Sequence, residues 1–331
     1  MSSGGISSAN LVQVGLVVAF ASLTHDEQRA VERAWSNAAM IATRWEPAFE
    51  SFGLRPVAAD TRGADILIYL GESSRFEEVA GKAAQRVPII FVKSTVEELL
   101  HHLPDAPPRY RMCAGVQGIA QTLASIAPLA PTVDWKTLPW PGSVAGLTEL
   151  DEAEDAFVYT SIRTFREAAR QRDIRWVTGL PSGEQAFSLF LPMHDPVAAR
   201  LANIALRHWP QCTVLAGDGM VATCTPEGAR WPSRLTRVRH WSPRINSPSN
   251  RLFRKAMGNE PLPDFDSSGM LFGTMCFLDS ALLGGAMPKR LEAAGRHPGP
   301  LGLMGMRPSG RPHPQRLVVV RGQRIKVLTI E

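Results

Sequence analysis

The fold is decided near the end of the chain by the stretch Gly299-Pro-Leu-Gly-Leu-Met-Gly-Met-Arg-Pro-Ser-Gly-Arg-Pro-His-Pro, followed one residue later by Arg316-Leu-Val-Val-Val-Arg-Gly-Gln-Arg-Ile-Lys-Val-Leu. Its glycines and prolines predict a turn, a short strand and a second turn at Ser309-Gly310. The apolar runs Leu317–Val320 and Ile325–Leu328 then flank four polar or glycine residues, which predicts a β-hairpin. The chain is therefore expected to end in β-structure rather than in a helix.

The beginning of the chain predicts a buried parallel strand followed by a helix. Val12–Phe20 is a continuous apolar run, which is typical of a strand covered on both faces of a parallel sheet. Thr24 stands where a helix N-cap would, with Gln28 near the capping-box position. Apolar residues then recur every three to four positions as far as Trp45, so we expect one apolar helical face to extend to that residue.

Strands and helices are predicted to alternate through the rest of the chain. This alternation, with short loops, indicates doubly wound open sheets. The strands expected are Arg55–Ala59, Ala64–Leu70, Val87–Val92, Ile174–Thr178, Ser188–Pro192 and Thr213–Ala216, and the helices are Phe76–Gln85, Thr95–Leu103, Glu149–Gln171, Val197–Arg207, Ser267–Gly284 and Pro288–Ala294.

The chain divides into segments of different composition. Residues 130–145 hold three prolines and two tryptophans, so we expect the crossing between two lobes there. The predicted organisation is a disordered N-terminus at 1–10, an N-terminal α/β lobe at 11–130 and a C-terminal α/β lobe at 131–266. Residues 267–331 would supply a helix that returns between the lobes and the closing hairpin.

A resemblance to a known family follows from these segments in order. Arg109-Tyr-Arg-Met-Cys-Ala-Gly-Val-Gln-Gly is an aromatic-arginine strand that leads into a Gln-Gly helix start. Together with the tail, it resembles the type I periplasmic solute-binding proteins, the leucine/isoleucine/valine-binding family and its amide-sensor relatives. The resemblance implies two doubly wound parallel-sheet lobes joined by a hinge. It also implies a transport receptor or sensor that binds a small polar, amino-acid-like or amide ligand by lobe closure.

In the first lobe, polar residues follow two predicted strands. Gly71-Glu-Ser-Ser lies between a strand and a helix, where unpaired N–H groups attract anions. The resemblance implies that Ser73 and Ser74 hold a ligand carboxylate and that Thr95 occupies a ligand-binding threonine position. Lys93 stands where a small residue is usual, so it would add a cation for an acidic ligand or fill the site. Ser74 as a simple helix cap and Lys93 as a solvated loop residue are the alternatives.

In the second lobe, the resemblance implies two further ligand contacts. Tyr159 is the only tyrosine available there to stack on a ligand, although a position in the helix core suits it equally. Asp218 stands between two glycines after an apolar strand and would pair with a ligand ammonium group. An Asp-Gly turn is the competing interpretation of the same residue.

A basic stretch from Arg230 to Lys255 supports a different function. It contains eight Arg and Lys residues, with Trp231 and Trp241 among them. Such a surface could dock an acidic protein, which would make the chain a degenerate, ligand-free binding-protein scaffold that serves as an interaction module. No nucleic-acid-binding motif accompanies the stretch, so we expect no nucleic-acid partner.

Composition and missing motifs exclude other classes. The 331 residues carry a net charge of +5 and four cysteines without CxxC spacing, which argues against a zinc site, and a Cys212–Cys224 disulfide stays an open alternative. No P-loop, G-x-S-x-G, HExxH or G-x-G-x-x-G occurs, so we expect no catalytic residues, metal or cofactor. No apolar run is long enough to span a membrane. The start lacks signal-peptide features, which predicts a cytoplasmic chain as written, or an extracytoplasmic one if it is a processed form.

Overall fold

The computed structural model describes residues 11–20, 23–52, 63–95, 98–100, 106–142, 144, 150, 152–182, 185–221, 224–225, 228–282 and 291–330. The chain forms two compact units, the first from residues 1–114, 241–315 and 331, and the second from residues 115–240 and 316–330. The backbone therefore changes unit after Ala114, His240, Gln315 and Ile330. The proline-rich stretch 130–145 belongs to the second unit.

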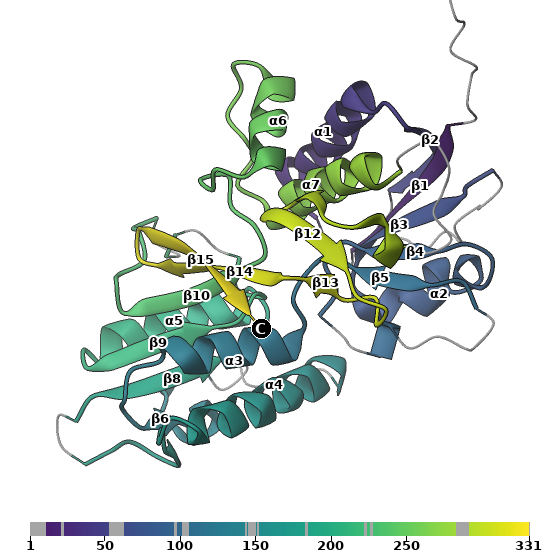
Figure 1. Ribbon diagram of the computed structural model, residues 1–331. Helices are drawn as coiled ribbons and strands as arrows, with labels where there is room; N and C mark the ends of the chain where they lie inside the picture. Colours follow the sequence, from purple (N-terminus) through teal and green to yellow (C-terminus); the bar gives the residue numbers. More distant parts are fainter. Residues whose placement is uncertain are drawn as a thin grey trace, which may run out of the picture. The chain divides into compact units, whose positions relative to one another are not determined.

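The first unit is built on a five-stranded parallel sheet in the order β2-β1-β3-β4-β5 (Figure 1). Helices α1, α6 and α7 lie on one face of this sheet and α2 lies on the other. The bounds are β1 Val12–Ala19, α1 His25–Ile41, β2 Trp45–Phe52, β3 Ile66–Gly71, α2 Phe76–Ala80, β4 Ile89–Phe91, β5 Arg109–Arg111, α6 Pro248–Met257 and α7 Asp266–Ala281; a small sheet adds β11 His297–Gly299, β12 Gly302–Met306 and β13 Pro312–His313.

Strand β1 shows why its sequence is apolar throughout. Leu16 and Val18 pack in the core beneath α1 and α7, whereas Val17 and Ala19 pack in the core beneath α2. Because successive side chains point to opposite faces, a strand covered by helices on both sides needs apolar residues at every position. The strand predicted at Val12–Phe20 is thus confirmed.

Helix α1 begins as predicted but ends earlier. Its N-cap is Thr24, and the capping-box partner is Glu27 rather than Gln28. The prediction that the helix extends to Trp45 is wrong, since Trp45 opens β2. The reason is a long-range contact, because the Asp279 carboxylate accepts hydrogen bonds from the Thr43 N–H and hydroxyl at 2.8 and 3.0 Å.

Two other predicted segments of the first unit differ from the structure. The helix expected at Phe76–Gln85 consists of the short α2 and a separate 3-10 turn at Ala83–Gln85. The strand expected at Arg55–Ala59 lies outside the described residues. Only a 3-10 turn at Glu98–Leu100 is described from the helix expected at Thr95–Leu103.

The second unit contains a seven-stranded sheet in the order β15-β14-β10-β9-β8-β6-β7. Strands β6 to β10 are parallel, and β14 joins β10 in antiparallel fashion, so the predicted tail hairpin β14–β15 is confirmed as the edge of this sheet. The bounds are α3 Val116–Ile126, β6 Thr132–Val133, α4 Glu152–Arg170, β7 Trp176–Val177, β8 Phe187–Leu191, α5 Val197–His208, β9 Cys212–Ala216, β10 Leu235–Arg239, β14 Gln315–Arg321 and β15 Arg324–Ile330.

Strand β8 anchors helices on both faces of this second sheet. Phe190 stacks on Phe165 of α4 with ring centroids 4.5 Å apart. Leu189 and Leu191 join the core that includes Leu201 of α5. The predicted α/β class with parallel sheets is therefore confirmed in both units.

Two kinds of feature are absent from the part of the chain that the structure describes. None of the helices there combines the length and the apolar character that a membrane crossing requires. Within the same part of the chain, no group of three or more His, Cys, Asp or Glu side chains could hold a metal ion. Cys212 and Cys224 are both free thiols, so the structure does not contain the disulfide weighed from the sequence.

Candidate ligand-binding site

The turn after β3 in the first unit is tightly packed against β1. A Cβ atom at Gly71 would lie 2.4 Å from the Ala19 carbonyl oxygen, so only glycine fits there. The same oxygen accepts a hydrogen bond from the Glu72 N–H at 2.9 Å. The Tyr69 hydroxyl donates to the Glu72 carbonyl at 2.7 Å, and burial raises the pKa of this phenol, so it remains a donor. These contacts fix the turn that carries Ser73.

A pair of serine hydroxyls lies at the carboxyl ends of β3 and β4. The Oγ atoms of Ser73 and Ser94 are 2.7 Å apart, and Ser94 is buried. Ser74, which the sequence assigned to the site, is exposed, and the structure brings Ser94 rather than Ser74 to Ser73. The sequence analysis missed Ser94, although its position directly after a predicted strand was a usable signal.

The loop after β4 is held by hydrogen bonds from two buried side chains, those of Arg111 and Cys113. The Thr95 side chain is buried, and the backbone carbonyl oxygen of Thr95 accepts a hydrogen bond from Nη1 of the fully buried Arg111 at 3.3 Å. The Cys113 thiol donates to the Ser94 carbonyl at 3.1 Å. Lys93 is half-buried in the same loop. Of the four first-unit residues predicted for the site, Ser73, Lys93 and Thr95 thus cluster around the ends of β3 and β4.

In the second unit, Asp218 is held by a histidine that the sequence analysis did not single out. Asp218 follows β9 and is only 6% exposed, and His240 follows the neighbouring strand β10 and is 1% exposed. Nε2 of His240 lies 3.0 Å from Oδ2 of Asp218. Both groups come from the carboxyl ends of adjacent parallel strands, which is where open α/β sheets place ligands.

Backbone contacts fix the loop around Asp218. The Gly217 N–H donates to the Leu191 carbonyl at 3.1 Å, and the Gly219 carbonyl accepts from the Asp195 N–H at 3.1 Å. These bonds tie the loop after β9 to the last residue of β8 and to Asp195 beyond it. The backbone that carries the Asp218 carboxylate is therefore fixed by hydrogen bonds to residues at and just after the end of the neighbouring strand β8.

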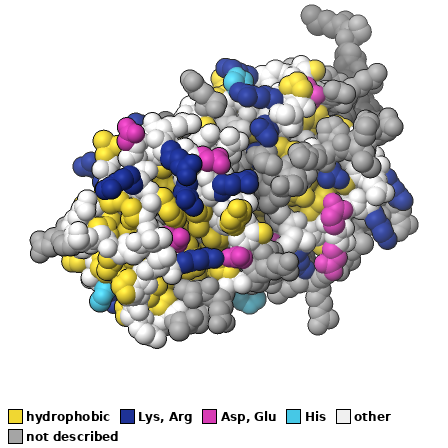
Figure 2. Space-filling view, turned by 90° about the horizontal axis from the view of Figure 1, so that it is seen from below, with side chains coloured by type: hydrophobic (Ala, Val, Ile, Leu, Met, Phe, Trp, Pro, Cys, Tyr) yellow, Lys and Arg dark blue, Asp and Glu magenta, His cyan; other side chains and the backbone are white. Residues whose placement is uncertain are grey.

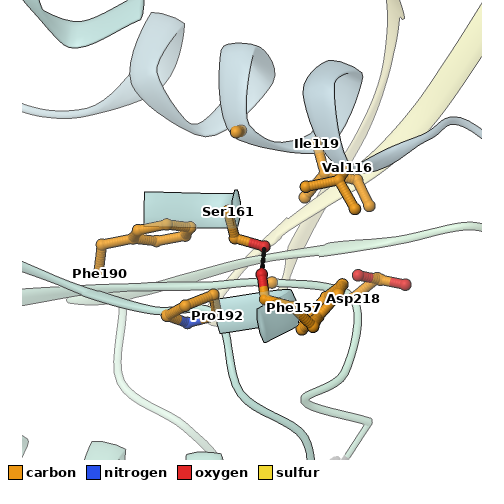
Figure 3. A pocket seen from close by; sticks show the side chains of 9 residues that line it. Val116, Ile119, Phe157, Ser161, Phe190, Pro192 and Asp218 are labelled. Carbon is orange, nitrogen blue, oxygen red and sulfur yellow. Dashed lines mark hydrogen bonds between the residues drawn. The ribbon is translucent and has the colours of Figure 1, made fainter. Parts of the chain in front are cut away.

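A pocket opens beside Asp218 within the second unit (Figure 3). Its volume is about 220 Å³ when the open space at its mouth is counted, and its enclosed part has room for about one water molecule. Helices α3 and α4 and the ends of β8 and β9 supply its walls, from Val116, Ile119, Ala120, Phe157, Ser161, Phe190, Pro192, Gly217 and Asp218.

Helix α4 turns Phe157 and Ser161, not Tyr159, toward this pocket. Phe157 and Ser161 are four residues apart and share one helical face, and the Ser161 hydroxyl donates to the Phe157 carbonyl at 2.9 Å (Figure 3). Tyr159 is 66% exposed and is not among the lining residues. The structure therefore does not bring together Tyr159 and Asp218 in this pocket, and helical periodicity could have identified Phe157.

Comparison with known proteins gives a likeness of structure without a match of sequence. No protein-family model and no curated protein sequence matches this chain. A substrate-binding protein of an ABC transporter from Desulfitobacterium hafniense matches with a TM-score of 0.68 and 15% identity, over 96% of this chain and 99% of that one. A solute-binding protein from Rhodopseudomonas palustris HaA2, solved with p-hydroxybenzoic acid, has a TM-score of 0.68 and 10% identity, over 97% of each chain.

A third protein with a similar structure is named for the amino acid leucine. The leucine-binding protein of Thermotoga maritima MSB8 has a TM-score of 0.65 and 15% identity, over 97% of this chain and 99% of that one. At such low identity the likeness establishes the fold alone. The chain has the fold of the substrate-binding proteins of ABC transporters, which confirms at the level of the fold the resemblance found in the sequence.

Proposed function

We propose that this chain is a small-molecule-binding protein, acting as a transport receptor or as a ligand sensor. The observation that carries the proposal is the Ser73–Ser94 hydroxyl pair at the carboxyl ends of two adjacent parallel strands. Substrate-binding proteins with the same fold, including one solved with p-hydroxybenzoic acid, support it. Within the second unit, the candidate groups are Asp218 and the pocket beside it.

The hydroxyl pair suits an anionic or polar group of a ligand. One of the two hydroxyl protons lies between Ser73 and Ser94, so the other can be donated outward. A hydrogen bond from a neutral donor to a carboxylate contributes about 1.5–3 kcal/mol. The α2 helix that follows is only five residues long, so the serine hydroxyls carry more of this chemistry than a helix dipole would.

The finer roles drawn from the resemblance stay predictions. These are the ligand contacts of Thr95, Lys93 and Tyr159, an amino-acid-like or amide ligand, lobe closure, and the pairing of Asp218 with an ammonium group; the contact of Asp218 with His240 argues against the last of these.

A thermal-shift screen followed by calorimetry tests the proposal. The panel contains amino acids, their amides, and aliphatic and aromatic carboxylates, because a ligand that binds only the folded state raises the melting temperature. We expect at least one compound to bind, and Ser94→Ala to weaken a carboxylate ligand about tenfold. Ser74→Ala is the matched control and should change Kd less than twofold, because Ser74 is exposed. Silence across the panel from a cooperatively folding protein would overturn the proposed function.

The structure gives less support to an interaction module built on the basic stretch from Arg230 to Lys255. Trp231 and Trp241 are core residues, and Arg237 and Arg239 are buried in β10. The exposed cations of the stretch are Arg230, Arg244, Arg251, Arg254 and Lys255, of which the first belongs to the second unit and the others to the first. On the face seen in Figure 2, Lys and Arg side chains stand in small groups, with acidic ones among them.

A further inference from the structure

The carboxylate predicted to receive a ligand ammonium group already has a protein partner. Asp218 Oδ2 and His240 Nε2 are 3.0 Å apart, and both side chains are almost fully buried. Because Nε2 faces an acceptor, this nitrogen carries a hydrogen in either charge state of the ring. His240 therefore donates to the acid and competes with any ligand group that would do the same.

A ligand ammonium would be poorly accommodated whichever charge state His240 adopts. If the imidazole is protonated, the pair is neutral overall, and an added ammonium would leave a net positive charge in a buried site. If the imidazole is neutral, Asp218 can balance one positive charge, but an ammonium brings three donors that must all be satisfied. Burying such donors without acceptors costs binding free energy.

The walls of the adjoining pocket supply few acceptors for those donors. Among the lining side chains, only those of Asp218 and Ser161 carry polar atoms, so apart from the Asp218 carboxylate they offer an ammonium group a single acceptor, the Ser161 hydroxyl oxygen. Aromatic rings and aliphatic groups make up the rest of the wall, including Phe157 and Phe190. The enclosed space has room for a group about the size of a methyl, and its largely apolar walls suit a methyl group better than an ammonium group.

We infer that His240 is a specificity-determining residue, because it occupies Asp218 and so makes the second unit select ligands that present an apolar or aromatic group and no ammonium group. The inference rests on the proposed function and narrows its ligand class to carboxylic acids or neutral compounds without an α-amino group. His240 acts through Asp218 and need not touch the ligand itself.

Matched ligand pairs that differ only in the amino group test this inference. We would measure calorimetric Kd values for leucine against 4-methylpentanoate, phenylalanine against 3-phenylpropanoate, and tyrosine against 3-(4-hydroxyphenyl)propanoate. For at least one pair, the wild-type chain should bind the member without the amino group at least tenfold more tightly. This measurement needs no variant, so it does not depend on how substitutions affect folding.

Variants at His240 then test the role of the residue itself. His240→Leu removes the donor that competes with a ligand for the Asp218 carboxylate, so the preference within a pair should fall at least tenfold. His240→Gln keeps a terminal N–H near the position of Nε2 and should retain the preference. His208→Leu is the matched control, because His208 is exposed at the end of α5 in the same unit, and it should leave both Kd values unchanged.

The outcomes separate the inference from the proposed function. Equal or tighter binding of the amino acids by the wild type overturns the inference and leaves the proposed function standing. If folded His240→Leu still prefers the ligand without the amino group to the same degree, His240 is not the cause of that preference. This result likewise overturns the inference. No binding of either member of any pair, nor of any other compound in the screen, overturns the proposed function and the inference with it.

Discussion

The close contact between β3 and β1 at Gly71 makes a sharp test of how the first unit holds Ser73. A methyl group introduced by Gly71→Ala would lie 2.4 Å from the Ala19 carbonyl oxygen and 2.8 Å from its carbon. Even weakly attractive carbon–oxygen contacts stay near 3.3 Å or beyond. The ends of the two strands must therefore separate by about 0.9 Å to admit the methyl group.

The free-energy cost has two parts. Overpacking a close contact of this kind costs about 1–3 kcal/mol. The Ala19 oxygen also accepts the Glu72 N–H at 2.9 Å, and the same displacement would weaken this bond at a cost of about 1 kcal/mol. We therefore expect Gly71→Ala to lower the free energy of unfolding by about 2–4 kcal/mol. Because Ser73 follows two residues later, its 2.7 Å contact with Ser94 should also be lost.

Urea unfolding followed by circular dichroism measures the loss, and hydrogen exchange of the β1 and β3 amides locates it. Gly142→Ala is the control, because a Cβ at Gly142 meets nothing within 4 Å. That variant should stay within about 0.5 kcal/mol of the wild type. If Gly71→Ala also loses less than about 0.5 kcal/mol and binds the ligand of the wild type unchanged, the close packing does not hold the turn, and the reasoning fails.

Two further predictions concern stability and thiol chemistry. Arg234 donates to three carbonyls at and beyond the end of α5, at 2.8–3.2 Å. Arg234→Met should therefore lower the free energy of unfolding in urea by about 1–2 kcal/mol, whereas Arg230→Met, at an exposed arginine, should lower it by less than about 0.5 kcal/mol. Equal losses in the two variants would refute this capping role. Burial raises the pKa of the Cys212 and Cys276 thiols to about 12, so at pH 8 a chromogenic disulfide reagent should modify exposed Cys224 rapidly and these two only upon unfolding. Because the pKa of these two thiols is raised in the folded state, the stability that they contribute is present below about pH 9 and should fall as the pH rises toward 12. Urea titrations at several pH values measure this fall. A free energy of unfolding that stays unchanged over this range would contradict the prediction.

Segments whose burial is uniform were predictable from the sequence. The run at β1 could be recognised because a strand covered on both faces must be apolar at every position, and the core contacts of Leu16 and Val17 on opposite faces show this directly. The tail hairpin was predictable because Gly322 adopts a left-handed φ of 55° at the turn between β14 and β15. In both cases, local sequence and final environment favour the same structure.

Strand β10 was missed because its arginines suggest an exposed basic surface. In Leu235–Arg239 all five residues are buried, and Nη1 of Arg237 lies 3.4 Å from the Met220 carbonyl in the loop that follows Asp218. Burying a guanidinium is favourable only when the fold supplies acceptors, and here an acceptor comes from another strand's loop. Residue type alone could not indicate that environment.

The end of α1 was missed for a related reason. The apolar spacing continues beyond Ile41, and nothing within the segment forces the helix to stop there. The structure ends it because Asp279 of α7 accepts the N–H groups of Thr43 and Arg44, both at 2.8 Å. An acid 235 residues or more away along the chain thus decides where the helix gives way to β2.

The same dependence on neighbouring strands governs the candidate site. Sequence reasoning singled out Ser73 and Asp218 by their positions after apolar strands. It did not pair them with Ser94 and His240, although the position of Ser94 after a predicted strand was a usable signal. Each partner follows the strand that lies beside the first one in the sheet, β4 beside β3 and β10 beside β9. In a parallel sheet, the chemistry of a residue at a strand's carboxyl end depends on the residue at the end of the next strand. Whether an acid such as Asp218 binds a cation therefore depends on its neighbour, and the neighbour here is His240, at 3.0 Å.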